Sequence, residues 1–263
     1  MTRTVSQLLD LKGKTALVTG GSRGLGLQMA HALGEAGARI MLTSRKAGDL
    51  EQAAAELQAA GIDTRWIAAD CAKEEEIHRL ADETMQRLGE VDILVNNAGA
   101  AWGAPAEDHP VEGWDKLMNL NVRGYFILSQ HIAKRSMIPR KGGRIINISS
   151  IAGLGGNPAG MHTLAYNTSK GAVISFTQAL GCEWGRYNIT VNAICPGFFP
   201  SRMTQSTLAR LGEAELAAHA PLQRLGDDED LKGVTLLFAS DAGKHITGQW
   251  LAVDGGVSVV TGG

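Results

Sequence analysis

Short, almost uninterrupted apolar runs recur along the chain, separated by longer segments in which apolar residues recur every three or four positions. Apolar runs bounded by turn residues are typical of strands buried on both faces, and the longer period is typical of amphipathic helices. The predicted strands span residues 14–19, 39–43, 64–68, 91–96, 144–148, 190–194 and 249–253. The predicted helices span residues 25–37, 49–60, 74–88, 111–137, 165–184 and 228–239.

Strands and helices alternate along most of the chain. Apolar strands joined by helices form a parallel sheet that is covered on both faces. We therefore predict an α/β fold, a doubly wound (Rossmann) sheet of about seven strands. No internal repeat or Gly-, Pro- or Ser-rich linker interrupts the pattern, so residues 1–263 are expected to form a single domain. The alternation breaks at 198–225, where an inserted helix-like segment is expected to form a lid.

Composition narrows the class of protein. Hydrophobic residues make up 44% of the chain and charged residues 20%, as in soluble globular proteins, and a net charge of −2 favours neither nucleic acid nor an anionic membrane as a partner. The three cysteines are scattered, which argues against a disulfide framework. No stretch approaches the roughly 18 apolar residues of a membrane span, and residues 1–14 hold no signal-peptide core. We expect a cytoplasmic protein without a metal site.

Tyr166 and Lys170 stand four residues apart in a predicted helix and therefore share one face of it. A tyrosine, with a free pKa of about 10, exchanges protons poorly at neutral pH, but a neighbouring ammonium favours the phenolate and lowers that pKa. Ser150 follows a predicted strand and is a candidate to hold a substrate oxygen beside the phenol. Most Tyr-x-x-x-Lys pairs are surface residues, so this pair depends on the rest of the chain for its meaning.

A glycine-rich turn, Thr19-Gly20-Gly21-Ser22-Arg23-Gly24-Leu25-Gly26, joins the first strand to the first helix. Glycines permit a tight turn there and bring backbone amides and a helix N-terminus close to a pyrophosphate. Glycine also marks any tight strand–helix joint, but the position after the first strand of a βαβ unit indicates a dinucleotide site.

The spacing Thr-Gly-x-x-x-Gly-x-Gly resembles that of the short-chain dehydrogenase/reductase family. Further family motifs follow in order, Asn96-Asn97-Ala98-Gly99, Asn121, Ser150, Tyr166, Lys170 and Pro196-Gly197, and cover essentially the whole chain. The resemblance implies that Tyr166 protonates the developing alkoxide, Lys170 lowers its pKa and holds the nicotinamide ribose, and Ser150 binds the substrate oxygen. It also implies that Asn121 anchors a proton-relaying water. Ser149 is the rival for the serine role; we choose Ser150 because the residue that adjoins the following loop matches the family's second serine, and we interpret Ser149 as structural.

The expected cofactor is NADP(H). An NAD-selective site places a carboxylate at the end of the second strand, but Ser44 and then Arg45 stand there, with no acid before Asp49. An arginine pairs with a 2′-phosphate that a carboxylate would repel, and Arg23 adds a second cation; two solvated surface arginines are the alternative. The resemblance completes the set of expected cofactor contacts: Gly20, Ser22, Arg23, Gly24, Leu25, Gly26, Ser44, Arg45, Asp70, Cys71, Asn97, Ala98, Gly99, Tyr166, Lys170, Pro196, Gly197, Phe199 and Ser201.

The interval between Ser150 and Tyr166 is a few residues longer than is usual in the family. We assign the extra length to the loop 155–162, at the expected substrate cleft, and interpret its His162 as incidental rather than as a catalytic acid. Cys71 and Cys195 are interpreted as buried fillers rather than reactive thiols. Apolar lid residues either line a substrate pocket or pack the lid itself, and the sequence leaves this open: Phe198, Phe199, Met203, Leu208 and Leu211.

The implied reaction is hydride transfer between a carbonyl and an alcohol. The favoured substrate is a 3-oxoacyl thioester on CoA or an acyl carrier protein, because 199–204 resembles such reductases, and Lys141 and Arg186 fall where they place basic residues for an acidic carrier. The alternative is a sugar-acid or polyol dehydrogenase of the gluconate 5-dehydrogenase kind. A nucleotide-binding regulator is disfavoured because all four catalytic residues are present. The resemblance further implies a homotetramer.

Overall fold

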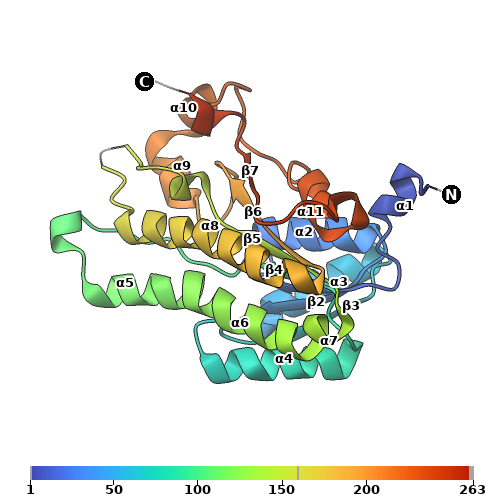
Figure 1. The fold of residues 1–263 in the computed structure, drawn as a ribbon. Helices are drawn as coiled ribbons and strands as arrows, with labels where there is room; N and C mark the ends of the chain where they lie inside the picture. The colour runs from blue at the N-terminus through green and yellow to red at the C-terminus, as the bar shows by residue number, and fades with distance from the viewer. Residues whose placement is uncertain (1, 159, 261–263) are drawn as a thin grey trace.

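The computed structural model describes residues 2–158 and 160–260, and its centre is a seven-stranded parallel sheet in the order β3-β2-β1-β4-β5-β6-β7 (Figure 1). All seven predicted strands are confirmed, with ends that differ by at most two residues. The strands are β1 Thr15–Thr19, β2 Arg39–Ser44, β3 Thr64–Ala68, β4 Ile93–Asn96, β5 Gly143–Ile148, β6 Ile189–Pro196 and β7 Trp250–Val253.

Helices cover both faces of the sheet, as the doubly wound prediction requires (Figure 1). Successive strand residues face opposite sides, so in β1 Val18 packs beneath α2, α3 and α11, while Leu17 packs on the side of α4 and α6. The helices are α1 Val5–Leu9, α2 Gly24–Glu35, α3 Ala47–Ala59, α4 Glu74–Leu88, α5 Val111–Met118, α6 Gly124–Ile132, α7 Ile138–Arg140, α8 Leu164–Trp184, α9 Gln205–Leu211, α10 Glu213–Ala218 and α11 Lys232–Ala239.

The predicted helix 111–137 is present but is not a uniform α-helix. Two π-helical turns, Asn119–Arg123 and Ala133–Met137, separate α5, α6 and α7. A π-turn accommodates one extra residue and changes the direction in which the following side chains point. The first of these turns contains Asn121, so the irregularity lies at a predicted site residue.

Two further differences have local causes. The hydrophobic period does not reveal the short α1, because that helix has no buried residue and begins with a capping box in which Thr4 and Gln7 exchange hydrogen bonds. The predicted helix 228–239 begins at Lys232, because Asp230 accepts two bonds from Arg224 and one from the Asp227 amide and so holds the preceding residues in a turn.

The sheet order reverses between β1 and β4, and this reversal positions the site. In a parallel sheet all strands end at the same edge, and the loops diverge where the order reverses. The chain after β1 and the chain after β4 meet there: Asn97 Nδ2 donates to the Thr19 and Gly20 carbonyls at 2.9 and 3.2 Å. Among the described residues no helix is long and apolar enough to cross a bilayer.

Candidate active site

The predicted catalytic residues come together at the carboxyl edge of the sheet from three elements. Ser150 follows β5, Tyr166 and Lys170 lie in the first two turns of α8, and Asn121 lies in the π-turn before α6. α8 packs against β6 and against the turn that follows Ser150, which brings the strand end and the helix together. The tertiary structure thus places the serine and the tyrosine side by side, although they are far apart in the chain.

Ser150 and Tyr166 form a hydroxyl pair. The Ala152 amide donates to Ser150 Oγ at 3.1 Å, which leaves the serine proton free for the phenol. Burial raises the pKa of Tyr166, and the hydrogen bond with Ser150 acts in the opposite direction without cancelling it. The sequence predicts a lowered pKa for Tyr166. This direction is wrong, because burial disfavours the phenolate more strongly than the hydrogen bond with Ser150 favours it. Tyr166 therefore carries its proton at neutral pH, as a proton donor must.

Lys170 is a buried cation, with 4% of its surface exposed. Its Nζ donates to the Ile148 carbonyl at 2.8 Å and lies 5.7 Å from the centre of the Tyr166 ring and 5.9 Å from that of Tyr125. Burial lowers the pKa of Lys170 to about 8, although the Cys195 sulfur favours its charged form. The ammonium therefore persists at neutral pH beside the two rings and is lost at moderately alkaline pH.

Asn121 is fully buried, and its side chain joins two neighbouring segments. Its Oδ1 accepts from the Ala100 amide at 2.9 Å, and its Nδ2 donates to the Ala100 carbonyl and to Ser169 Oγ, both at 3.0 Å. Both amide protons are thus used within the protein. A Cβ built on Gly99 would lie 3.2 Å from Asn121 Oδ1 and 3.6 Å from Lys170 Nζ, so only glycine leaves the space between these groups open.

Three residues support this set: Tyr125 and Ser169, for which the sequence predicts no role, and Ser149, which is predicted to be structural. Tyr125 stands one helical turn after Asn121, and its hydroxyl donates to the Ile148 carbonyl at 3.3 Å. Ser169 donates to the Tyr166 carbonyl at 2.8 Å. Ser149 donates to the Lys170 carbonyl at 2.7 Å and is buried, so it fastens α8 to β5, whereas Ser150 is only half-buried. The sequence signal that could have identified Tyr125 is its four-residue spacing from Asn121, which places both residues on one face of a helix.

The glycine-rich turn has a backbone that fits a dinucleotide. Gly20 and Gly24 adopt φ angles of +63° and +52°, in the left-handed region that favours glycine. A Cβ on Gly26 would lie 2.3 Å from the Gly20 carbonyl oxygen, so the turn tolerates no side chain there. α2 begins at Gly24 without a side-chain cap. The backbone amides of its first turn, which includes Leu25, and those of the turn around Ser22 are therefore available to an anion.

The end of β2 carries the predicted selectivity residues. Ser44 Oγ is buried and has no hydrogen-bond partner, as expected for a hydroxyl that awaits a ligand group. Arg23 pairs with Asp49 of α3 at 2.8 Å, so its guanidinium lies beside this strand end. Arg45 follows Ser44 and is exposed. These residues fit the adenosine end of a phosphorylated dinucleotide.

Two of the predicted cofactor contacts, Asp70 and Cys71, follow β3, and the side chain of each is already engaged within the protein. Asp70 Oδ1 accepts from the Ala72 amide at 3.0 Å, and the Asp70 amide donates to Glu76, so Asp70 forms a turn before α4. The Cys71 side chain packs in the core, which leaves only its backbone for a cofactor. Burial raises the pKa of Cys71 to about 12 and that of Cys195 to about 11, so both thiols stay protonated and serve as small core residues.

The segment after β6 begins at the same edge. Gly197 donates to the Val253 carbonyl at 2.9 Å, and a Cβ on Gly24 would lie 3.9 Å from Ser201 Cβ, so the lid starts beside the glycine turn. The Phe199 side chain is buried in the core, where it excludes any side chain at Gly226. The other apolar lid residues differ from Phe199: Phe198 and Leu208 are half-buried, Met203 is exposed, and the Leu211 side chain lies outside the described residues.

A cavity of about 310 Å³ opens next to the catalytic helix. The loop that the sequence assigned to the substrate cleft forms much of its wall, and within that loop Ala159 lies outside the described residues. His162 lines it with a φ of +48° and an exposed side chain, and none of the hydrogen bonds of the described residues involves its ring. Lid helix α9 reaches this loop, because Arg210 donates to the Gly160 carbonyl at 3.1 Å.

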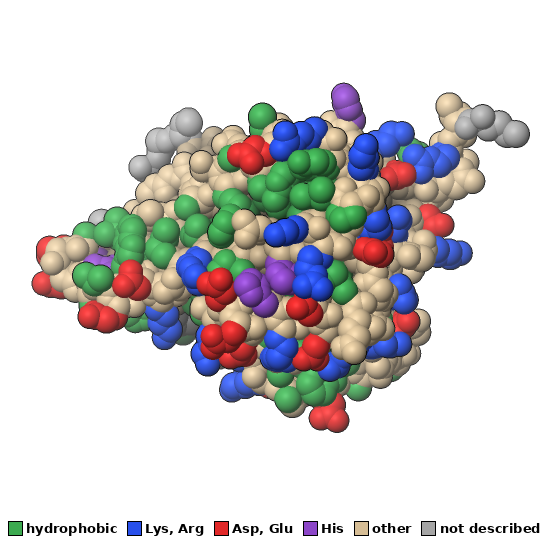
Figure 2. Space-filling model, turned by 60° about the horizontal axis from the view of Figure 1, so that its bottom comes forward, with side chains coloured by type: hydrophobic (Ala, Val, Ile, Leu, Met, Phe, Trp, Pro, Cys, Tyr) green, Lys and Arg blue, Asp and Glu red, His purple; other side chains and the backbone are tan. Residues whose placement is uncertain are grey.

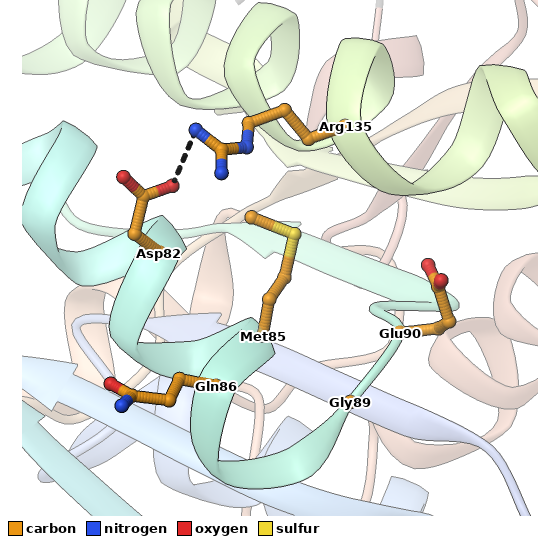
Figure 3. Close-up of a pocket in the computed structure, with 6 residues that line it drawn as sticks. All are labelled: Asp82, Met85, Gln86, Gly89, Glu90 and Arg135. Atoms are coloured by element: carbon orange, nitrogen blue, oxygen red, sulfur yellow. Dashed lines mark ion pairs between the residues drawn. The ribbon is translucent and has the colours of Figure 1, made fainter.

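A second depression, of about 460 Å³, lies between the end of α4 and the π-turn before α7 (Figure 3). Arg135 pairs there with Asp82 at 3.3 Å. α4 ends just before β4 begins, so this depression belongs to the opposite edge of the sheet from Tyr166. Lys141 and Arg186 lie at that edge too, the latter about 30 Å from Tyr166 along α8, at 1.5 Å per residue. Neither therefore borders this chain's own cleft. No cluster of three metal-binding side chains occurs among the described residues.

Comparisons with known proteins agree with this geometry. The sequence model of the family described as short chain dehydrogenase matches residues 14–211. The rhamnolipids biosynthesis 3-oxoacyl-[acyl-carrier-protein] reductase of Pseudomonas aeruginosa is 40% identical over 94% of this chain and 97% of its own length. Gluconate 5-dehydrogenase of Gluconobacter oxydans is 35% identical over 96% of this chain and 97% of its own length. A crystal structure of a gluconate 5-dehydrogenase from Burkholderia cenocepacia, in complex with NADP and tartrate, is 33% identical with a TM-score of 0.92, covering 98% of this chain and 100% of the other.

The lowered pKa of Lys170 predicts a pH-dependent stability. Its folded-state pKa of about 8 lies below the ordinary value of 10.5, so between these values the unfolded chain binds more protons and the free energy of unfolding rises with pH. Lys170→Met lacks this contribution. We expect the unfolding free energy of the wild type, relative to Lys170→Met, to rise by roughly 2–3 kcal/mol across this window in urea titrations. A difference that stays constant with pH would contradict a buried ammonium.

Proposed function

The chain belongs to the short-chain dehydrogenase family, and we propose that it transfers a hydride between NADP(H) and a carbonyl, most readily that of a 3-oxoacyl thioester. The observation that carries the proposal is the meeting of Ser150, Tyr166 and Lys170 at one edge of the sheet, with the tyrosine protonated and the lysine charged at neutral pH. When bound, the reduced nicotinamide supplies the hydride. The chain's own residues bind the carbonyl oxygen and deliver the proton.

The proposed roles follow from the contacts. Ser150 has a free proton and orients the carbonyl oxygen toward the Tyr166 phenol, which donates its proton as negative charge develops on that oxygen. The Lys170 ammonium, 5.7 Å from the centre of the Tyr166 ring, would stabilise the resulting phenolate. Asn121 holds the loop after β4 against α8 and retains one lone pair of Oδ1 for a water. Residues 198–225 would close over the bound substrate.

Support for NADP(H) comes from the end of β2 and from a relative. Ser44 presents a buried, unpartnered hydroxyl there, and Arg23 and Arg45 present cations. The Burkholderia gluconate 5-dehydrogenase structure holds NADP. A carboxylate that would select the unphosphorylated ribose is not present at the strand end itself; the carboxylate of Asp49 lies in α3 and is paired with Arg23.

Support for a thioester comes from the similarity to the Pseudomonas 3-oxoacyl reductase. Either CoA or an acyl carrier protein would present such a substrate, although Lys141 and Arg186 do not border the cleft of their own chain. The second candidate is a sugar-acid dehydrogenase, favoured by the similarity to the Gluconobacter and Burkholderia enzymes. NADPH oxidation with acetoacetyl-CoA, compared with NADP⁺ reduction with gluconate and polyols, separates the two.

We also propose that the protein is cytoplasmic and tetrameric. The cysteines are free, as in a reducing compartment. Hydrophobic side chains gather on the face shown in Figure 2, and Phe126 of α6 is 47% exposed. β7 ends the sheet, with Trp250 and Leu251 exposed by 44% and 45%.

Removing the proton donor tests the reaction. Tyr166→Phe keeps the ring and removes only the hydroxyl, so we expect kcat for NADPH-dependent ketone reduction to fall about 10³-fold. Tyr187→Phe, at the opposite end of α8, is the matched control and should retain full activity. Unchanged turnover of Tyr166→Phe would refute the catalytic assignment.

Removing the cations tests the cofactor. Arg45→Ala and Arg23→Ala should each weaken NADPH binding about 10- to 100-fold, since a charge-assisted bond contributes roughly 1.5–3 kcal/mol, and should leave NADH binding within about twofold. Fluorescence titration measures both constants, with Arg135→Ala as the control. A wild-type preference for NADH would exclude the cofactor assignment.

Light scattering tests the assembly. We expect a mass four times that of one chain, and Phe126→Asp or Trp250→Asp to shift the protein toward smaller species, because each places a charge on a face that the assembly would bury. A monomeric wild type would rule out the tetramer.

A further inference from the structure

The cavity beside the catalytic helix has two walls from separate parts of the chain. One wall is the loop after β4, and the other is the loop that precedes α8. The lining residues are Ala104, Ala106, Gly155, Gly156, Asn157, Pro158, Gly160, His162, Thr163, Leu164 and Asn167. Asn167 lies in the first turn of α8, so the cavity lies at the end of the helix that carries the proton donor Tyr166.

The two walls are in backbone contact. A Cβ built on Gly103 would lie 1.7 Å from the His162 carbonyl oxygen, far closer than any real contact, so the loop after β4 lies flush against the other wall. The shape of the cavity therefore depends on where the loop before α8 is held.

Three polar side chains hold that loop, and we call them the Asn157 cluster: Asn157, Thr163 and Asn167. Asn157 Nδ2 donates to Thr163 Oγ1 at 2.7 Å and to Asn167 Oδ1 at 3.2 Å. Asn167 Nδ2 donates to the Gly155 carbonyl at 2.8 Å, and its amide donates to the Thr163 carbonyl at 2.8 Å. The longer loop is thus fastened to the first turn of the helix that carries Tyr166.

The lining is neutral. Among the described residues that form it there is no Lys, Arg, Asp or Glu, and His162, whose side chain is exposed, is its one titratable residue. A carboxylate placed there would lose hydration without a cation in the lining itself, and the guanidinium of Arg210 at the lid side of the wall is already bonded to the Gly160 carbonyl. Amide, hydroxyl and carbonyl groups are instead matched by the side chains and backbone of the wall.

We propose that this cavity receives the part of the substrate beyond the reacting carbonyl, that it selects a neutral chain over a carboxylate, and that Asn157 and Asn167 are the positioning residues that set its shape. The inference rests on the proposed carbonyl reduction and narrows its substrate to a neutral ester or thioester. Asn157 and Asn167 act on substrate affinity through the loop, whereas the transfer itself is left to Ser150 and Tyr166.

The charge preference is tested on the wild-type enzyme with two substrates that share one ketone. NADPH oxidation is followed with ethyl acetoacetate and with acetoacetate. We expect kcat/KM for the ester to exceed that for the acid at least tenfold. Equal values, or a preference for the acid, would overturn the neutral-cavity assignment.

The positioning role is tested with Asn157→Ala, Asn167→Ala and the double variant. For acetoacetyl-N-acetylcysteamine, a neutral thioester, we expect KM to rise five- to tenfold in each single variant and, in the double variant, by less than the product of the two single effects, because the residues share one bond while each also makes a bond of its own. For 2,3-butanedione, which is too short to need the cavity, kcat and KM should stay within twofold. Thr168→Ala, an exposed hydroxyl on the same helix turn, is the control.

Fluorescence titration with NADPH shows whether each variant is folded. If Asn167→Ala loses NADPH binding, the positioning role is judged from Asn157→Ala alone, because Asn157 lies outside α8. An unchanged KM for the thioester, or equal losses for thioester and dione, would overturn the positioning role. If the wild type reduced none of these ketones, the proposed function would fail and this inference with it, whereas a failure of the inference alone leaves wild-type activity intact.

Discussion

The site depends on the burial of one ammonium group. Lys170 Nζ lies almost out of solvent, and the Ile148 carbonyl at the end of β5 accepts its hydrogen bond. A buried charge is costly unless polar groups surround it, and here the Tyr125 hydroxyl shares that carbonyl while two aromatic rings face the ammonium. The same contact fixes the position of α8 relative to the sheet, so it also places Tyr166, one turn earlier, against Ser150. Catalytic geometry and helix docking therefore have a common origin.

The neighbouring segments are joined by polar side chains rather than by apolar contacts. Asn97 ties the chain after β4 to the glycine turn, and Asn121 ties the next residues to α8. Such bonds are directional, so they hold loops at a defined distance where apolar packing would tolerate sliding. The Asn157 cluster repeats this arrangement at the outer wall of the cleft. The site is consequently a set of loops with short tethers, on a sheet that has a hydrophobic core on each face.

The fold could be predicted well from the chain because each strand contains a run of apolar residues and each long helix keeps a clear period. The prediction was weaker where local contacts compete with that period. The π-turn at Asn121, the capped helix α1 and the late start of α11 all depend on hydrogen bonds between particular side chains and backbone groups, which a hydrophobic pattern does not encode. The direction of the Tyr166 pKa was wrong for a related reason: charge spacing along a helix is visible in a sequence, but depth of burial is not.

The amino-acid sequence by itself determined the reaction chemistry, because the residue types and their order along a βαβ chain admit few other uses. The choice of Ser150 over Ser149 was also made from the sequence, but only the tertiary structure gave its physical reason, the hydrogen bond from the Ser149 hydroxyl to the Lys170 carbonyl of α8. The tertiary structure also placed Lys141 and Arg186 at the edge of the sheet opposite Tyr166 and brought Gly103 against His162. These are contacts between residues distant in sequence, and they follow from how helices pack on the sheet, a property that no local spacing records.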